Sequence, residues 1–202
     1  MRQVPDILKF LIKDVVWRIN PDEKCIYLTF DDGPIPEVTP LVLDILDDFN
    51  AKATFLCVGE NVSKYPKVFE SVKQRGHAVG NHTFNHVKGF QYSVDDYRSN
   101  VTKADELIKS PIFRPPHGQI KPQQIKDLKK DFKILLWDFI TYDYDKSIAP
   151  AKVYKEVQNK SRNGSIVVFH DSLKAQKNML NVLPKALKFW QTEGYEIKKV
   201  SF

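Results

Sequence analysis

The 202-residue sequence contains only two cysteines, Cys25 and Cys57. Two cysteines are too few for a disulfide framework or a cysteine-based zinc site. Each lies inside an apolar run that predicts a strand, so we expect two buried free thiols. Internal repeats, low-complexity tracts and linkers are also missing, and 42% hydrophobic with 28% charged residues is typical of a folded, soluble protein. A chain of this length suits one domain, or at most two small ones, with a substantial core.

No long apolar run opens the sequence. Lys9, Lys13 and Asp14 interrupt the apolar residues of the first twenty positions at helical spacing, which is too often for a signal peptide or a membrane span. We expect residues 1–20 to form an amphipathic helix that packs on a single domain of residues 21–202. A helix that lies on a membrane surface is the alternative. Without a visible signal peptide, the cytoplasm is the default location.

The charge balance is positive but not concentrated. The 31 lysines and arginines exceed the 25 aspartates and glutamates by 6, which allows a polyanionic partner. However, the densest group of lysines, within residues 121–133, alternates with apolar residues as an exposed helix face does. A nucleic-acid partner is therefore not expected.

From the first cysteine onward, short apolar runs alternate with segments of helical periodicity. Residues 41–49 and 178–193 show helical spacing, and Ser93-Val-Asp-Asp96 resembles a capping signal for a helix that runs toward Lys109. This alternation predicts an α/β fold with about seven parallel strands, either an open doubly wound sheet or a closed or incomplete barrel. In both, functional groups gather beyond the carboxyl ends of the strands. The predicted strands span residues 25–30, 53–58, 78–80, 112–113, 133–136, 166–169 and 196–200.

Polar side chains follow directly after these predicted strands. Four of the five histidines stand at such positions, which scattered surface histidines would rarely do. The polar and aromatic groups are Asp31 and Asp32 after the first strand, His82 and His86 after the third, Arg114 and His117 after the fourth, Trp137, Asp138 and Asp143 after the fifth, and His170 and Asp171 after the sixth.

His82 and His86 are candidate metal ligands. Their i, i+4 spacing would place both imidazoles on one side of a helical turn, although such a pair alone is more often structural. A carboxylate from another strand end would complete a two-histidine, one-carboxylate set, which leaves coordination positions open for water and substrate. Zinc is the default ion for these ligands, and iron, cobalt, nickel and manganese are the alternatives.

The remaining polar groups suit acid–base catalysis. Only one of Asp31 and Asp32 is needed as a ligand, so the other can take a proton from metal-bound water, whose pKa falls toward ~7 on zinc. His170 is a candidate to protonate a leaving group, with Asp143 to orient it and keep it charged. Arg114 is a candidate to pair with the basic aspartate. Each residue alone has an ordinary structural explanation, but together, in one region, they indicate a hydrolase.

These segments resemble the five ordered motifs of the polysaccharide deacetylases, the NodB-homology domain of carbohydrate esterase family 4. The resemblance covers about residues 25–202, and the first two motifs together are highly specific. It implies a distorted, incomplete (β/α) barrel with seven or eight strands and metal-dependent removal of N- or O-acetyl groups from sugars. Because members are often exported, the cell envelope is a second possible location. The motifs are Thr29-Phe-Asp-Asp-Gly33, His82-Thr-Phe-Asn-His86, Arg114-Pro-Pro-His-Gly118, the segment from Trp137 to Asp145, and Val168-Phe-His170.

The resemblance implies a role for each motif residue. It divides the paired carboxylates between proton transfer and metal binding, and it makes a backbone N–H near His117 part of the oxyanion site together with the metal. The implied roles are Asp31 as catalytic base, Asp32, His82 and His86 as metal ligands, Arg114 as the residue that orients Asp31, His170 as general acid, and an acid of the fourth motif, for which we choose Asp143, as the residue that tunes His170.

Three positions depart from the family pattern. His117 stands where the third motif usually has Tyr, Tyr144 where the fourth usually has Trp, and Val168 where the fifth usually has Leu. We expect these residues and Trp137 to line or border the substrate site. Because none of them is a catalytic group, the departures should affect the choice of substrate rather than activity itself.

The expected activity is removal of acetyl groups from N-acetylated amino sugars of a peptidoglycan- or chitin-like glycan, with metal-bound water as the nucleophile. The same machinery would serve a carbohydrate O-acetyl esterase, because both reactions pass through a tetrahedral oxyanion. A catalytically silent carbohydrate-binding module is the alternative from another class, but it would not need both Asp31 and His170. The expected partners are an acetylated glycan and one divalent metal, without nucleic acid or a transmembrane segment.

Overall fold

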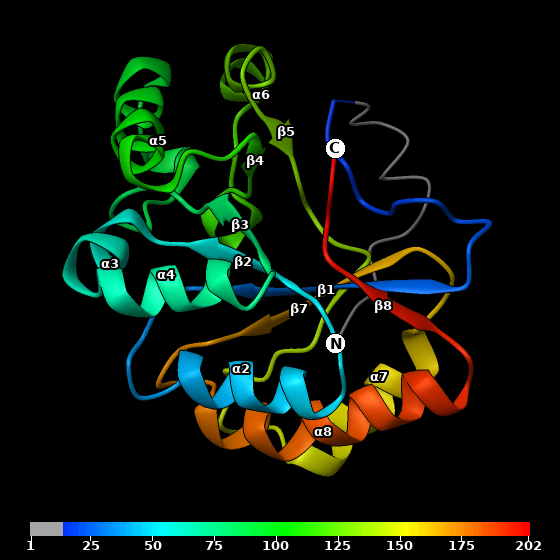
Figure 1. The fold of residues 1–202 in the computed structure, drawn as a ribbon. Helices are drawn as coiled ribbons and strands as arrows, with labels where there is room; N and C mark the ends of the chain where they lie inside the picture. Colours follow the sequence, from blue (N-terminus) through cyan, green and yellow to red (C-terminus); the bar gives the residue numbers. More distant parts are fainter. Residues whose placement is uncertain (1–13) are drawn as a thin grey trace.

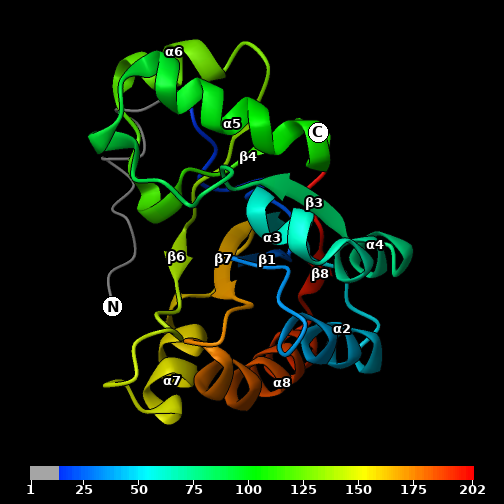
Figure 2. The same ribbon diagram turned by 90° about the vertical axis from the view of Figure 1, so that its left-hand side faces the viewer.

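Eight parallel strands form one curved sheet, and helices cover its outer side (Figure 1 and Figure 2). The computed structural model describes residues 14–202. Seven strands follow the order β5-β4-β3-β2-β1-β7-β6, and β8 pairs with the beginning of β1. The strands are β1 (Cys25–Asp31), β2 (Thr54–Cys57), β3 (Ala78–Asn81), β4 (Ile112–Phe113), β5 (Lys133–Ile134), β6 (Phe139–Ile140), β7 (Ser165–His170) and β8 (Glu196–Lys198).

The helices form groups that cover different parts of the sheet. Helix α8 packs against α7, α2 and β7, and helix α5 packs against α3, α6 and β3 (Figure 1). The helices are α2 (Thr39–Asp48), α3 (Gly59–Lys64), α4 (Pro66–Gln74), α5 (Val94–Ile108), α6 (Pro122–Leu128), α7 (Pro150–Lys160) and α8 (Gln176–Thr192).

Alternation along β1 separates the two faces of the sheet. Successive side chains of a strand point to opposite faces. Ile26, Leu28 and Phe30 belong to the buried cluster that the sheet shares with α2 and α8. Tyr27 belongs to a different cluster, which is built mainly from strand residues and lies on the concave side. The same alternation places Asp31 on the concave side, at the end of the strand.

The register of the strands aligns their carboxyl ends. Asp31 of β1 pairs with His170 of β7. On the other side of β1, Cys57 of β2 pairs with Asn81 of β3, and Asn81 pairs in turn with Phe113 of β4. The segments that follow these strands therefore leave the sheet at one edge, where ligands bind in parallel α/β folds.

The predicted fold class is confirmed, and the sheet is the incomplete barrel rather than an open doubly wound sheet. All seven predicted strands are present. Strand β6 was not predicted, because it has only two residues within a segment of mixed aromatic and polar side chains. Ser93 accepts a hydrogen bond from the backbone N of Asp96 at 3.1 Å, so the predicted capping signal does begin α5. Cys25 and Cys57 are buried free thiols, as expected.

The predicted N-terminal helix falls mainly on residues 1–13, which lie outside the described residues. The described remainder, residues 14–20, contains no helix. Val16 instead forms a parallel bridge with Leu135, and its carbonyl accepts a hydrogen bond from the N–H of Leu136 at 2.8 Å. None of the helices within residues 14–202 is long and apolar enough to cross a membrane.

Candidate metal and acid–base site

A cavity of about 380 Å³ lies at the carboxyl ends of the strands. Eight of the residues singled out in the sequence line it, and they lie at the ends of six different strands or in the segments that follow them. The sequence-predicted lining residues are Asp31, Asp32, His82, His86, His117, Trp137, Tyr144 and His170; Ile140, Ser172 and Lys174 complete the lining.

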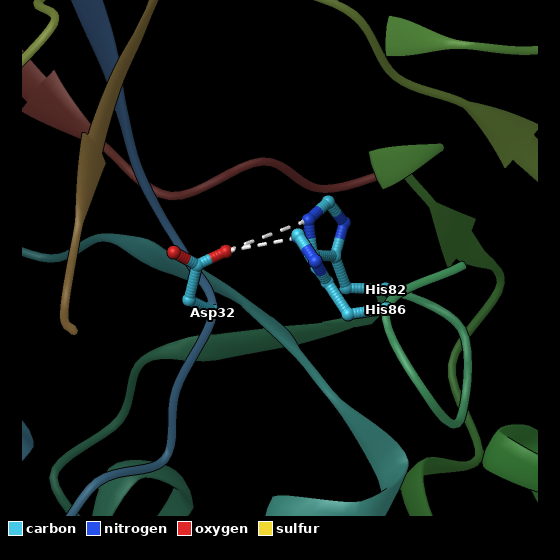
Figure 3. A group of neighbouring side chains, drawn as sticks. All are labelled: Asp32, His82 and His86. Atoms are coloured by element: carbon cyan, nitrogen blue, oxygen red, sulfur yellow. Dashed lines mark ion pairs between the residues drawn. The ribbon is translucent and has the colours of Figure 1, made fainter. Parts of the chain in front are cut away.

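Asp32, His82 and His86 line this cavity, and their side chains converge on one point (Figure 3). The Oδ1 atom of Asp32 lies 3.2 Å from Nε2 of His86 and 3.9 Å from Nε2 of His82. Three ligand atoms bound at 2.0–2.2 Å to one tetrahedral ion would lie roughly 3.4 Å apart. The spacing and the N/N/O donor set therefore fit a divalent metal that keeps one or more coordination positions open.

The two histidines do not lie on a helical turn, so that part of the sequence interpretation is wrong. Thr83 and His86 have positive φ angles of 63° and 54°, and the segment is an irregular loop after β3. The side chain of Asn81 stabilises this loop by accepting a hydrogen bond from the N–H of Thr83 at 2.9 Å. The loop nevertheless brings the two rings to a centroid distance of 5.1 Å. Both imidazoles therefore face Asp32 from the same side (Figure 3).

The protonation state of His82 suits a metal ligand. Its Nδ1 lies 2.8 Å from the carbonyl oxygen of Arg114, which can only accept, so Nδ1 carries the proton and the lone pair of Nε2 faces Asp32. Burial lowers the pKa of His82 to about 4, although the charge of Asp31 opposes the shift. The imidazole is therefore neutral near pH 7, as coordination requires.

Asp32 is held as an ionised carboxylate. Burial would raise its pKa, but a hydrogen bond from His86 and the nearby His170 and His82 rings lower the pKa well below its usual value. Its φ of 86° is unusual for a residue other than glycine. The Nδ2 group of Asn61 donates a hydrogen bond to the Asp32 carbonyl at 2.8 Å, which holds this backbone conformation in place.

Arg114 lies fully buried beneath the cavity and holds Asp31. Its Nη1 donates to Oδ1 of Asp31 at 2.5 Å and to Oγ1 of Thr29 at 2.9 Å. The rest of the guanidinium is fixed by backbone carbonyls, because Nη2 donates to Leu136 at 3.1 Å and Nε to Leu135 at 3.3 Å. One oxygen of Asp31 is thus fixed by a buried cation, and Asp31 also lines the cavity with the metal cluster.

His170 is tied to Asp143 by its ring and by its backbone. Its Nδ1 lies 2.7 Å from Oδ1 of Asp143, and its N–H donates to Oδ2 at 2.9 Å. Burial would lower the pKa of His170, but the charge of Asp143 and its hydrogen bond, with the charges of Asp32 and Asp31, raise the pKa to about 9. The ring is therefore protonated at neutral pH. With Nδ1 occupied, Nε2 is the proton donor that can face a substrate.

Three of the four residues expected at the substrate site line the cavity, and the fourth, Val168, does not. His117 and Tyr144 contact two of the candidate site residues: the His117 ring lies 4.8 Å from that of His86, and the Tyr144 ring packs edge-on against His170, also at 4.8 Å. Trp137 lines the cavity. Val168 does not, because it is fully buried two residues before the end of β7.

Asp171 is a buried acid that the sequence interpretation left without a role. It accepts hydrogen bonds from the N–H of Gly33 at 3.0 Å and from the Thr39 hydroxyl at 2.6 Å. Its own N–H donates to the Asp31 carbonyl at 3.1 Å. Asp171 thus connects the end of β7 to the end of β1 and to the loop after it, which carry Asp31 and Asp32. Its place directly after His170 was the only signal for it.

Asp138, another of the polar residues after a predicted strand, lies away from the cavity. Its carboxylate forms an ion pair with Arg162 at 2.6 Å and accepts a hydrogen bond from the Ser165 hydroxyl at 2.8 Å. Ser165 is the first residue of β7, so this ion pair lies at the opposite end of that strand from His170. Asp138 therefore belongs to the structural framework.

Comparison with known proteins identifies the family of this chain. The family model described as polysaccharide deacetylase matches residues 18–132. A peptidoglycan-N-acetylglucosamine deacetylase of Bacillus cereus is 34% identical over 83% of this chain, and the match spans 63% of that relative. A second enzyme of the same name and organism is 31% identical over 93% of this chain and 91% of its own length.

A solved structure agrees closely with this fold. The crystal structure of a peptidoglycan N-acetylglucosamine deacetylase in complex with 4-naphthalen-1-yl-N-oxidanyl-benzamide has a TM-score of 0.90 and 29% sequence identity, and the match covers 96% of this chain and 94% of that one. The motifs, the family match and this likeness agree. The chain belongs to the polysaccharide deacetylases, the NodB-homology domain of carbohydrate esterase family 4.

Proposed function

We propose that this protein is a metal-dependent hydrolase that removes acetyl groups from N-acetylated amino sugars of a peptidoglycan- or chitin-like glycan. The observation that carries the proposal is the shared cavity. Asp31, fixed by Arg114, and protonated His170, fixed by Asp143, line the same 380 Å³ cavity as the three candidate metal ligands. A binding module has no need of a buried base and a buried acid around a cation site.

Asp32, His82 and His86 would hold the ion. Two imidazoles and one carboxylate suit zinc, and iron, cobalt, nickel or manganese are the alternatives. When bound, such an ion supplies Lewis acidity, which lowers the pKa of water and polarises the acetyl carbonyl.

Each catalytic side chain has one task in this proposal. The Asp31 carboxylate accepts a proton from the attacking water, and Arg114 keeps that carboxylate in one orientation. His170 donates the proton on Nε2 to the amine nitrogen as the bond between nitrogen and the acetyl carbon breaks. Asp143 compensates the imidazolium charge throughout. A backbone N–H near His117 is the proposed additional donor to the oxyanion.

A carbohydrate O-acetyl esterase is the second candidate. The same acid and base would serve it, because an ester and an amide both pass through a tetrahedral oxyanion. The protonated state of His170 favours an amide substrate. An amine leaving group must be protonated before it departs, whereas the departure of an alkoxide depends less on protonation.

Acetate release from a panel of N- and O-acetylated glycans, with and without added divalent metal, tests the proposal. Metal-dependent release from N-acetylated sugars is expected. Asp31→Asn and His170→Gln should reduce kcat by roughly 10²–10⁴-fold while metal content stays near one ion per chain. Wild-type rates in either variant would refute the acid–base assignment, and absence of release from every glycan would refute the function.

A further inference from the structure

A second hollow of about 460 Å³ adjoins the catalytic cavity, and the charged residues that line it are all lysines. Lys174 lines both the hollow and the cavity, so the two adjoin at this side chain. We call the second hollow the lysine groove. It lies between the beginnings of α7 and α8, which pack side by side (Figure 1). Its lining residues are Lys146, Ile148, Ala149, Pro150, Leu173, Lys174, Gln176, Lys177 and Asn178.

The two walls of the lysine groove are fixed to each other. The buried side chain of Asn178, in the first turn of α8, donates hydrogen bonds to the carbonyl oxygens of Asp145 at 3.2 Å and Ile148 at 3.0 Å. These bonds attach the loop that carries Lys146 to the helix that carries Lys177. The groove is therefore preformed, and a ligand would not have to order its walls.

The positive charge of the lysine groove is not neutralised by the protein. Among residues 14–202, neither Lys146 nor Lys174 nor Lys177 forms an ion pair within 4 Å. Lys174 lies with its Nζ 5.2 Å from the centre of the Tyr144 ring, which keeps this charge at the junction of the two hollows. The nearby carboxylate of Asp145 accepts hydrogen bonds from the N–H and the hydroxyl of Ser147. Asp145 does not line the groove, so the lining carries three positive charges and no negative one.

We propose that the lysine groove binds a carboxylate carried by the glycan, next to the sugar whose acetyl group lies in the catalytic cavity. The inference rests on the proposed deacetylase function, and it narrows the substrate class to acidic oligosaccharides over neutral ones. Ammonium groups on flexible stems suit a carboxylate, because they act as point charges without a fixed bidentate geometry. Leu173, which is 60% exposed at the same groove, offers an apolar contact for the sugar or its substituent.

The test uses two substrates that differ only in charge. One is an alternating N-acetylglucosamine–N-acetylmuramic acid tetrasaccharide with free carboxylates, and the other is the same compound with its carboxylates converted to amides. The metal-loaded wild-type protein should prefer the carboxylate form by about 3- to 10-fold in kcat/KM, since each exposed charge pair contributes modestly. The same preference should appear in Kd measured by calorimetry, and high salt should reduce it.

Two double variants test whether the lysine groove causes the preference for the carboxylate substrate. Lys146→Gln/Lys177→Gln should lower the ratio of carboxylate to amide kcat/KM toward one. The matched control, Lys185→Gln/Lys188→Gln, removes the same charge from the exposed side of α8, at least about 12 Å along the helix from Lys177. It should keep the wild-type ratio. An equal loss in both double variants would mean that net charge, not the groove, sets the preference.

The outcomes separate the two proposals. Acetate release with equal kcat/KM and equal Kd for both substrates upholds the deacetylase and overturns the lysine groove. A lower Kd for the carboxylate form, without acetate release from any substrate, upholds the lysine groove and overturns the deacetylase. Because the salt dependence of the wild-type preference needs no variant, a poorly folded variant cannot leave the groove untested.

Discussion

The carboxylate of Asp143 contacts His170 twice, through the ring Nδ1 at 2.7 Å and through the backbone N–H at 2.9 Å. The two residues are 27 positions apart in the sequence. Both carboxylate oxygens are used, so the acid fixes the position of the strand end as well as the orientation of the ring. In the proposed reaction Asp143 is a positioning residue, because it would act only through His170.

Replacing Asp143 by Asn should therefore change both the rate and its pH dependence. The amide keeps the size of the side chain but removes the charge that, against the effect of burial, raises the pKa of His170 to about 9. We expect kcat to fall by roughly 10²–10⁴-fold and the basic limb of the kcat profile to move to lower pH. Metal content, measured in the same samples, should not change. A reduced rate with an unmoved basic limb would contradict the tuning role.

The free energy of unfolding should fall between pH 6.5 and 9 in the metal-free protein. The His170 imidazole titrates near 6.5 when unfolded and, because Asp143 outweighs burial, near 9 when folded. Its stabilising contribution is therefore complete below 6.5 and is lost as the pH rises through 9. Burial raises the pKa of Asp171 to about 8, against a hydrogen bond from Thr39. Its protonated form therefore stabilises the fold less and less as the pH rises from about 4 to 8, which steepens the decline up to pH 8. Denaturant unfolding of wild type and His170→Gln should show a shallower alkaline decline in the variant.

Much of the fold and the site could be predicted because both depend on local patterns. The apolar runs of β1 and β7 and the polar residues that follow them identified the barrel edge. The geometry that depends on distant segments could not be predicted. Nothing in the sequence indicates that Val168, in the same motif as His170, is sealed beneath the cavity. Nor does it indicate that Asn178 positions the lysine groove, because that depends on hydrogen bonds across 30 and 33 residues.

Removing Arg114 should destabilise the protein strongly. The guanidinium is fully buried against Asp31, and loss of one partner of a buried ion pair costs about 3–5 kcal/mol. We expect this cost for Arg114→Met in denaturant unfolding. The double variant Arg114→Met/Asp31→Asn should be less destabilised than the sum of the single variants, by about 0.5–3 kcal/mol.

Arg98→Met is the matched control for Arg114. Arg98 pairs with Asp127 and Asp131, but its side chain is 36% exposed, and such pairs contribute about 0–1 kcal/mol. Equal costs for the Arg98 and Arg114 variants, or additive effects in the double variant, would refute the special role of the buried pair.

Removal of metal by a chelator should abolish acetate release and lower the melting temperature, and added zinc should restore both. The reason is that an ion held by Asp32, His82 and His86 stabilises only the folded chain, by about 2.7 kcal/mol at a free concentration 100-fold above its Kd. Asp32→Asn should lose the zinc-dependent shift in melting temperature. Asp48→Asn, at the exposed end of α2, should keep it. One tightly bound ion per chain in Asp32→Asn would rule out this ligand set.

Tyr144→Trp and Val168→Leu should have different consequences, although both restore the usual family residue. Tyr144 lines the cavity, packs edge-on against His170 and lies beside Lys174. A larger ring there should change relative kcat/KM values across a panel of acetylated sugars by about 10- to 200-fold at most, the range for a methylene-sized change in a pocket. Val168 is fully buried, so an added methylene must be absorbed by a packed interior, at about 1–3 kcal/mol of stability. The substrate profile of Val168→Leu should therefore match that of the wild type.

Tyr144→Phe is the control for Tyr144→Trp. It keeps the ring and loses the hydroxyl, so it separates the effect of ring size from that of hydrogen bonding. If Val168→Leu alters the substrate profile while Tyr144→Trp does not, then Tyr144 does not contact the substrate and Val168 is not shielded from it.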